Sequence, residues 1–352
     1  MLKLARKTKG GEAVTPEASK NMRTISSLAE RALQQDLTSR PLPLTFDYLT
    51  PQASHLLNLS LLEVLPPGSF GSLGDSKDPR RLPSIRDQHR LLPGHHLVYF
   101  PPQVTLSELL RDGTDTLHDP GEPFHRRLWA GGSVTFPISG SLKLDGQRAV
   151  CVEKIRDVNV KGQDGDEMVF VTIERRFTTV SEDEDESQLR AKVSNSPDVL
   201  IETRDLVFLR EPDLASHPAA REKRIPADPD ISQRLTPNKA LLFRFSALTF
   251  NAHLIHLDQS YTKNIEGHDD LLVHGPLSLV LMLSVLSSHL ATSGLSIRKF
   301  EYKNLAPLHV DQEMRVCAKA KNNTEAGDWG VWIEGPSGGL AVRGTAWPLN
   351  AR

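Results

Sequence analysis

Four side chains that can move or orient a proton fall within positions 251–258 of this chain. They are Asn251, His253, His256 and Asp258. Imidazole exchanges protons near neutral pH, an amide orients water through hydrogen bonds, and a carboxylate can hold a histidine in place. The spacing therefore predicts a site for general acid–base chemistry.

A helix start follows this segment. His274-Gly275-Pro276 precedes the apolar run 277–286, and proline suits a first helical turn because its missing N–H would have no partner there. The free N–H groups of that turn, including that of Gly275, can stabilise a negatively charged oxygen. A base together with such a site can add or remove water next to a thioester carbonyl.

The elements expected to position these groups are a strand and a core helix. Phe243, Phe245 and Leu248 alternate with polar residues, which predicts a half-buried strand leading into the site. The run 277–286 predicts a buried helix. It is about half the length needed to cross a bilayer, so no membrane span is expected.

Composition excludes several classes of protein. The chain has 352 residues and a formal net charge of −2, without a basic stripe for nucleic acid. Two cysteines, Cys151 and Cys317, do not make a disulfide framework and are expected to be buried thiols. Six basic residues against two acidic ones in positions 1–23 fit a mitochondrial presequence or a basic tail. A mitochondrial location is therefore expected, with the cytoplasm as the alternative.

Two β-rich blocks of the chain resemble each other. Gln147–Cys151 and Glu313–Cys317 are similar, and each is followed by two further predicted strands, which indicates a degenerate internal duplication. We expect an α+β fold of two halves, each a helix wrapped by an antiparallel sheet. The strong apolar helix occurs only in the second half, which is expected to hold the site. The first half is expected to serve structure and acyl-chain binding.

The domain boundaries follow from shifts in composition. We expect a basic tail over 1–40, a first half over 41–211 that contains an acidic loop at 181–197, a connector over 212–237, and a second half over 238–352. Short apolar stretches predict a helix over 27–35 and a strand over 97–100.

The two motifs together carry a family resemblance. A helix wrapped by an antiparallel sheet is the hot-dog fold, so the chain is expected to be a double hot-dog. Segments 245–258 and 273–277 resemble the MaoC-type hydratases. More closely, with Trp129-Ala-Gly-Gly132, they resemble the mitochondrial hydroxyacyl-thioester dehydratases of type 2 and the mesaconyl-CoA hydratases.

The resemblance implies a hydro-lyase that interconverts a 3-hydroxyacyl thioester and the 2-enoyl thioester plus water. The general motif of these hydratases is Asp-x-Asn-Pro-x-His. His256 takes the position of its histidine, whereas Asn251 stands where the motif has aspartate. Because an amide cannot accept the proton of water, acid–base work is expected to rest on His256, with His253 or Asp258 assisting and His274 in support.

The same resemblance implies the partners. The substrate is expected on coenzyme A or on acyl-carrier protein, in mitochondrial fatty acid synthesis, with no metal or organic cofactor. The acyl group stays open between a straight chain and a branched dicarboxylate such as mesaconyl. A monomeric pseudo-dimer and a homodimer both fit the duplication.

Three other interpretations fit less well. A zinc site would draw on histidines 253, 256, 268 and 274 with Asp258, but the His-Glu-x-x-His pattern is missing. A hot-dog thioesterase needs a carboxylate near the helix, and positions 277–286 have none. A non-catalytic acyl-thioester-binding protein is favoured by Asn251 in place of aspartate, and disfavoured by both histidines and the Gly-Pro helix start.

Overall fold

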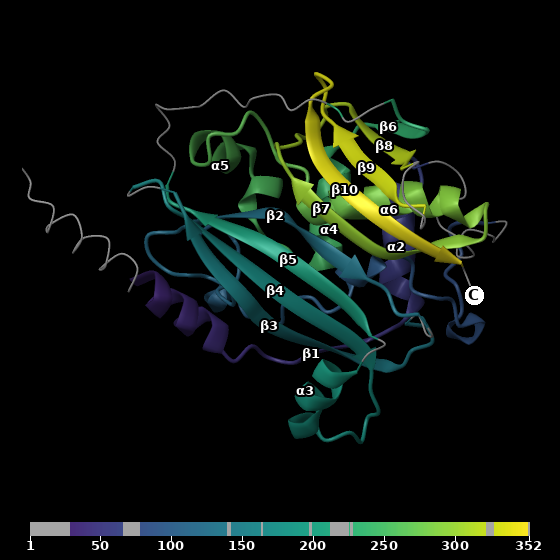
Figure 1. Ribbon diagram of the computed structural model, residues 1–352, viewed down its shortest axis with the longest axis horizontal. Helices are drawn as coiled ribbons and strands as arrows, with labels where there is room; N and C mark the ends of the chain where they lie inside the picture. The colour runs from purple at the N-terminus through teal and green to yellow at the C-terminus, as the bar shows by residue number, and fades with distance from the viewer. Residues whose placement is uncertain are drawn as a thin grey trace, which may run out of the picture.

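One antiparallel sheet runs through the described part of the chain, residues 29–65, 78–138, 142–162, 165–196, 199–211, 225, 228–321 and 327–350 of the computed structural model (Figure 1). The strands of the first half are β1 (Thr45–Tyr48), β2 (Arg126–Thr135), β3 (Arg148–Lys161), β4 (Met168–Thr179) and β5 (Leu200–Leu209). Those of the second half are β6 (Ile231–Leu235), β7 (Leu295–Asn304), β8 (Met314–Ala320), β9 (Trp329–Glu334) and β10 (Leu340–Asn350).

The strand order repeats. The sheet reads β1-β3-β4-β5-β2 in the first half, and read from the opposite edge it is β6-β8-β9-β10-β7 in the second. The halves join where β2 pairs with β7, from Gly131 opposite Lys303 to Thr135 opposite Lys299. Cys151 in β3 and Cys317 in β8 are both free and buried, and they lie in equivalent strands. The repeated order agrees with an internal duplication.

The central helix of the second half is α6 (Gly275–Ala291). It begins within the predicted helix start, with Pro276 in its first turn, and extends five residues beyond the predicted run 277–286, every residue of which is buried. It packs against β7, β8 and β9. Burying a leucine side chain contributes about 1.5–3 kcal/mol, so this helix is a main source of core stability.

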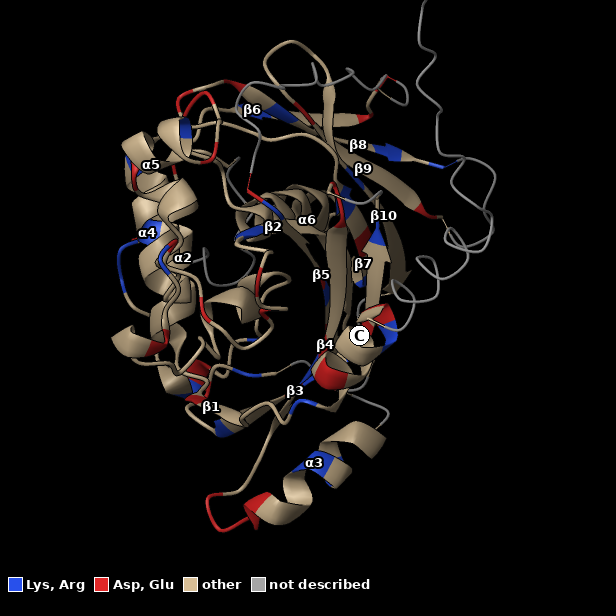
Figure 2. Cartoon of the chain, turned by 90° about the vertical axis from the view of Figure 1, so that its left-hand side faces the viewer, with Lys and Arg blue, Asp and Glu red and all other residues tan. Residues whose placement is uncertain are grey.

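The first half has no such helix among its described residues. At the equivalent place in the chain order it has three short 3-10 turns, η2 (Ile85–Asp87), η3 (His95–Val98) and η4 (Leu106–Glu108). Its α2 (Pro51–Leu61) pairs instead with α4 (Lys239–Thr249) of the second half, and the two lie on the same side of the sheet in Figure 2. The two halves therefore differ more than expected, because the first half has short 3-10 turns where a central helix was predicted.

Two strand predictions were wrong. Positions 243–248 belong to α4, whose first turn is capped by the Asn238 side chain accepting from the N–H of Leu241. The alternation was misleading because Phe243 is exposed, while the buried residues follow a helical spacing: Leu241, Leu242, Phe245 and Ser246. Positions 97–100 are not a strand either, since they include the end of η3 and the positive φ of Phe100.

The acidic segment 181–197 is not wholly a loop. It contains α3 (Glu186–Asn195), with Asp185 as its N-cap. Leu189 and Val193 are buried, one helical turn apart, in a small apolar cluster with β3 residues. These two buried residues attach to the sheet a helix whose other residues are mostly polar or charged.

The boundaries of the connector and the tail also need adjustment. Residues 231–235 of the expected connector form β6, an edge strand paired with β8 from Ile231 opposite Ala318. Only its two end residues, Ile231 and Leu235, are apolar, so no alternation distinguished the strand from the polar sequence around it. Within the expected tail, residues 29–39 are helical, and positions 1–28 lie outside the described residues. None of the described helices is long and apolar enough to span a membrane.

Candidate active site

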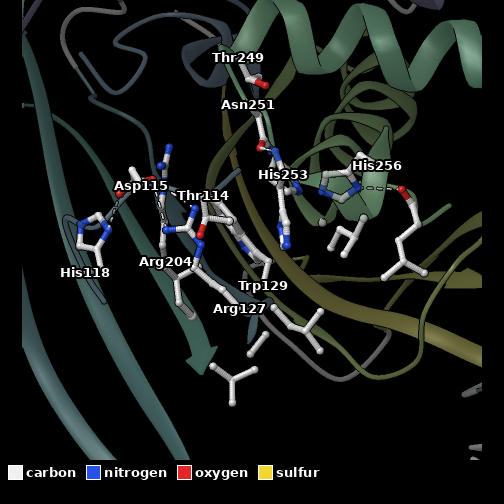
Figure 3. A pocket seen from close by; sticks show the side chains of 18 of the residues that line it. Thr114, Asp115, His118, Arg127, Trp129, Arg204, Thr249, Asn251, His253 and His256 are labelled. Atoms are coloured by element: carbon white, nitrogen blue, oxygen red, sulfur yellow. Dashed lines mark hydrogen bonds and ion pairs between the residues drawn. The ribbon is translucent and has the colours of Figure 1, made fainter. Parts of the chain in front are cut away.

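A cavity of about 540 Å³ is lined by residues from both halves of the chain. In Figure 3 Asn251, His253 and His256 lie on one side of it, and Thr114, Asp115, Arg127 and Arg204 lie on the other. The first group comes from the segment after α4, and the second from the first half. The cavity therefore needs the two halves to be joined.

The segment after α4 is shaped by backbone hydrogen bonds. Phe250 ends the helix with a φ of 53°, and the N–H of Asn251 then donates to the Ser246 carbonyl at 2.8 Å. The Asn251 side-chain oxygen accepts from the N–H of His253 at 2.9 Å. A 3-10 turn, η5 (Leu254–His256), follows and carries His256. Asn251 thus holds the turn together, and its amide nitrogen stays available for a ligand.

His256 is held in one tautomer. Its Nδ1 lies 2.8 Å from the Leu272 carbonyl oxygen, which can only accept, so Nδ1 carries the hydrogen and Nε2 keeps its lone pair. Burial lowers the pKa of His256 to about 4. The imidazole is therefore neutral at physiological pH, with one basic nitrogen in a residue that lines the cavity.

His274 lies behind His256. The two rings stack with their centroids 3.6 Å apart, and Nε2 of His274 is 2.8 Å from the Ser246 hydroxyl. Burial lowers the pKa of His274 well below its usual value, and His256 and His253 lower it further. His274 is not one of the residues that line the cavity, so it supports the His256 ring from the core.

Gly275 lines the cavity at the first position of α6. A Cβ here would come within 2.8 Å of Asn304 Nδ2 and 3.0 Å of the Trp129 side chain. Asn304 cannot easily move because its Nδ2 donates to the Trp129 carbonyl at 2.7 Å. The position therefore excludes any side chain, and a ligand can approach the backbone at the start of the helix.

Replacing Gly275 by alanine is expected to lower the free energy of unfolding by about 1–3 kcal/mol, because the added methyl overpacks a rigid site. Chemical denaturation measures it. Gly330→Ala is the control, since the closest atoms to a Cβ there are 3.8 Å away. Equal stability of the two variants would show that the contacts around Gly275 can relax.

Asp258 is the N-cap of a short helix. Its Oδ1 accepts from the N–H of Tyr261 at 2.9 Å and caps α5 (Gln259–Asn264), and the residue does not line the cavity. His253 does line it, and its Nε2 lies 3.5 Å from Oδ2 of Asp112 in the first half. Burial lowers the pKa of His253 well below its usual value, with further lowering by His256 and Arg127.

The opposite side of the cavity carries charge. Both terminal nitrogens of Arg127 donate to Asp115 Oδ2 at 3.2 Å. Arg204 pairs with Glu202 at 2.9 Å and lies over the Trp129 ring, 4.9 Å from its centroid. Arginine and acid are thus paired along this side, and the pairs come from β2, β5 and the loop before β2.

The structure brings four of the six residues expected at the site around the cavity: Asn251, His253, His256 and Gly275. His274 stacks behind them and Asp258 lies at the start of α5. Sequence reasoning missed Asp112 and the charged side of the cavity. The one signal near them was Trp129-Ala-Gly-Gly132, since Trp129 also lines the cavity. Among the described residues no three His, Cys, Asp or Glu side chains converge to hold a metal ion.

Acid is expected to destabilise the fold because His253, His256 and His274 are buried and neutral. Their folded pKa values lie below the unfolded value of about 6.5, so the unfolded state binds more protons as the pH falls. Stability is then complete above about pH 6.5 and decreases towards pH 4, by about 1.4 kcal/mol per histidine per pH unit. Chemical denaturation at pH 7.5, 6 and 5 measures it, and equal unfolding free energies would contradict it.

Solved structures with this architecture define the class. A MaoC-like dehydratase from Phytophthora capsici matches with a TM-score of 0.58 at 12% identity, over 89% of this chain and 97% of that one. The peroxisomal multifunctional enzyme type 2 of Drosophila melanogaster matches with a TM-score of 0.55 at 12% identity, over 96% of this chain and 53% of that one. The fold is that of the MaoC-like dehydratases, which confirms the expected double hot-dog.

Sequence comparison gives the family. The family model "Hydroxyacyl-thioester dehydratase type 2" matches residues 94–310. The mitochondrial hydroxyacyl-thioester dehydratase type 2 of Schizosaccharomyces pombe is 30% identical over 254 residues, 69% of this chain and 80% of that protein. The mesaconyl-C(4)-CoA hydratase of Chloroflexus aurantiacus is 32% identical over 258 residues, 72% of this chain and 82% of that one. The chain belongs to the hydroxyacyl-thioester dehydratase type 2 family.

Proposed function

We propose that this protein is a hydro-lyase that interconverts a 3-hydroxyacyl thioester and the corresponding 2-enoyl thioester plus water. The observation that carries the proposal is the fixed tautomer of His256, which leaves Nε2 with its lone pair in a residue that lines the same cavity as Gly275. The names of the relatives support it, since they are dehydratases and hydratases of acyl thioesters.

In the dehydration direction His256 Nε2 takes the proton from the carbon next to the thioester carbonyl. The electron pair of that C–H bond forms the double bond as the C–O bond to the hydroxyl breaks, and the imidazolium returns its proton to the hydroxyl, which departs as water. The N–H of Gly275 polarises the thioester oxygen while negative charge develops there. Asn251 holds the departing water. The reaction neither oxidises nor reduces the substrate overall, so the proposed step requires no redox cofactor.

Absorbance of the enoyl thioester tests the proposal. Purified protein is expected to consume the absorbance of crotonyl-CoA as water adds to the double bond, without release of free thiol. Thiol release would identify a thioesterase instead. Unchanged absorbance with both the coenzyme A and the acyl-carrier-protein thioesters would favour a non-catalytic binding protein.

A second candidate is the hydration of a dicarboxylate thioester such as mesaconyl-CoA. The observation in its favour is the pair of guanidinium groups on the cavity wall, Arg127 and Arg204, since arginine recognises carboxylates. Arg127 is already paired with Asp115, and Arg204 with Glu202. We therefore rank a substrate with an uncharged acyl group above a dicarboxylate. Faster turnover of mesaconyl-CoA than of crotonyl-CoA would reverse this order.

For location and carrier we propose the mitochondrion, and acyl-carrier protein or coenzyme A in fatty acid synthesis. The relatives from Schizosaccharomyces pombe and, at 28% identity, Saccharomyces cerevisiae are both described as mitochondrial, which supports the location. The basic composition of positions 1–23 is compatible with it. Fractionation of cells that express the tagged full-length chain tests the location, and recovery in the cytosol alone would overturn it.

A further inference from the structure

A carboxylate from the first half of the chain faces a histidine of the candidate site. Asp112 Oδ2 and His253 Nε2 are 3.5 Å apart, and both side chains are at least nine-tenths buried. Neither atom has a hydrogen-bond partner among the described residues. A buried carboxylate oxygen without a donor is costly, so His253, whose Nε2 lies 3.5 Å away, is its natural partner.

The rest of Asp112 is fixed in place. Its Oδ1 accepts from the N–H and the hydroxyl of Thr114, at 2.9 and 2.7 Å, and its carbonyl accepts from the N–H of Leu254 at 2.8 Å. The next residue, Gly113, has a φ of +82°, and a Cβ there would lie 2.0 Å from the Ala252 carbonyl oxygen. The loop of the first half thus presses directly against the segment 252–254.

We propose that Asp112 is the positioning residue of the site, holding His253 in the tautomer that carries hydrogen on Nε2. This rests on the proposed hydro-lyase function. Nδ1 of His253 is then the acceptor nitrogen, suited to the hydroxyl or water that leaves the substrate. The first half thereby supplies the carboxylate that position 251, an asparagine in this chain, does not provide.

The low pKa of His253 agrees with this arrangement. Burial, His256 and Arg127 keep the ring neutral, so the ring that lies 3.5 Å from the Asp112 carboxylate is a neutral imidazole. In such a contact the carboxylate selects the tautomer and leaves the ring uncharged. Replacing a carboxylate by an amide at this kind of contact favours the wrong tautomer.

The test is Asp112→Asn, which keeps an oxygen for Thr114 but turns an N–H donor towards His253. We expect kcat for crotonyl-CoA to fall at least about tenfold, with KM within about threefold. Asp185→Asn is the matched control, since Asp185 also caps a turn with its carboxylate, at the start of α3; its kcat should equal that of the wild type.

A double-mutant comparison separates positioning from structural damage. If Asp112 acts through His253, Asp112→Asn should change kcat less than about twofold in a His253→Gln background. Full multiplication of the two effects, or an unchanged kcat in the single variant, would overturn the proposal.

Nitrogen-15 spectra of the histidine rings decide the tautomer without activity. His253 of the wild type should carry hydrogen on Nε2, and Asp112→Asn should move it to Nδ1. A wild-type ring with hydrogen on Nδ1 would overturn the proposal even if the variant did not fold. If the wild-type protein is inactive towards every thioester tested, that result counts against the hydro-lyase function. The tautomer seen in the spectra then still tests whether Asp112 positions His253.

Discussion

Replacing His256 by alanine is expected to lower kcat for crotonyl-CoA at least about a hundredfold, the usual contribution of a general acid–base group. The change removes Nε2, the one nitrogen of this ring that is not bound to the Leu272 carbonyl. No other group is proposed both to take and to return the proton, so the loss should appear in kcat. The absorbance of the enoyl thioester measures it.

Two further variants make this result interpretable. His256→Gln keeps a polar side chain beside the His274 ring but has no basic nitrogen, so it should be nearly as inactive as the alanine variant. His289→Ala removes an exposed histidine near the end of α6 and should keep full activity. A fall of only a few-fold in His256→Ala, with an unchanged unfolding temperature, would remove His256 from its proposed role.

The largest expected effect on stability comes from Arg175. Its side chain is buried and contacts Glu153 at 2.7 Å, Glu202 at 3.4 Å and the Phe100 carbonyl at 3.0 Å. Arg175→Met would leave two buried carboxylates with less positive charge around them. Removing one partner of a buried ion pair costs about 3–5 kcal/mol, and we expect a loss of this size in urea denaturation.

The pH dependence of the Arg175 variant gives a second measure. Burial alone raises the pKa of Glu153, but His118, Arg175 and Arg204 outweigh burial and hold it at about 2. Because this folded pKa is below the unfolded value of about 4.3, the stabilisation is present at neutral pH and is lost between about pH 4 and pH 2. Without Arg175 the folded pKa should lie closer to the unfolded value, so acid should remove less stability and the loss should end at a higher pH.

Arg343→Met is the control for the Arg175 variant. Arg343 lies on β10 with an exposed side chain, and its replacement should change the free energy of unfolding by less than about 0.5 kcal/mol. If Arg175→Met were as stable as this control, the acidic residues around it would not need its charge.

Local patterns were enough to predict α6, the two similar β-rich blocks and the two strands that follow each block. The run 277–286 is apolar except for Ser278 and Ser284, and Pro276 comes directly before it, so its length and its start favour a buried helix. The strand prediction at 243–248 failed because it counted Phe243 as a buried residue. Phe243 is exposed, so its apparent alternation with polar residues, which is typical of a strand, does not reflect burial. The helical spacing appears only when Leu241, Leu242 and the cap at Asn238 are read with it.

The candidate site also contains residues that the sequence predicts and residues that it does not. One segment of the chain contains Asn251, His253, His256 and Gly275, and the types and spacing of these residues were enough to predict acid–base chemistry. Asp112 faces His253, and Arg204 lines the cavity, because the first half is joined to the second through β2 and β7. No short-range pattern encodes that pairing, since it depends on how two distant strands meet.

The seam between β2 and β7 has a genetic consequence. In an assembly of two identical chains, one codon change alters both copies of a loop at once, including the copy for which the change is harmful. Here the two halves of the sheet are encoded separately. Selection can therefore alter the segment around Asp112 while leaving the segment around His253 untouched, so each half can specialise for one side of a single cavity.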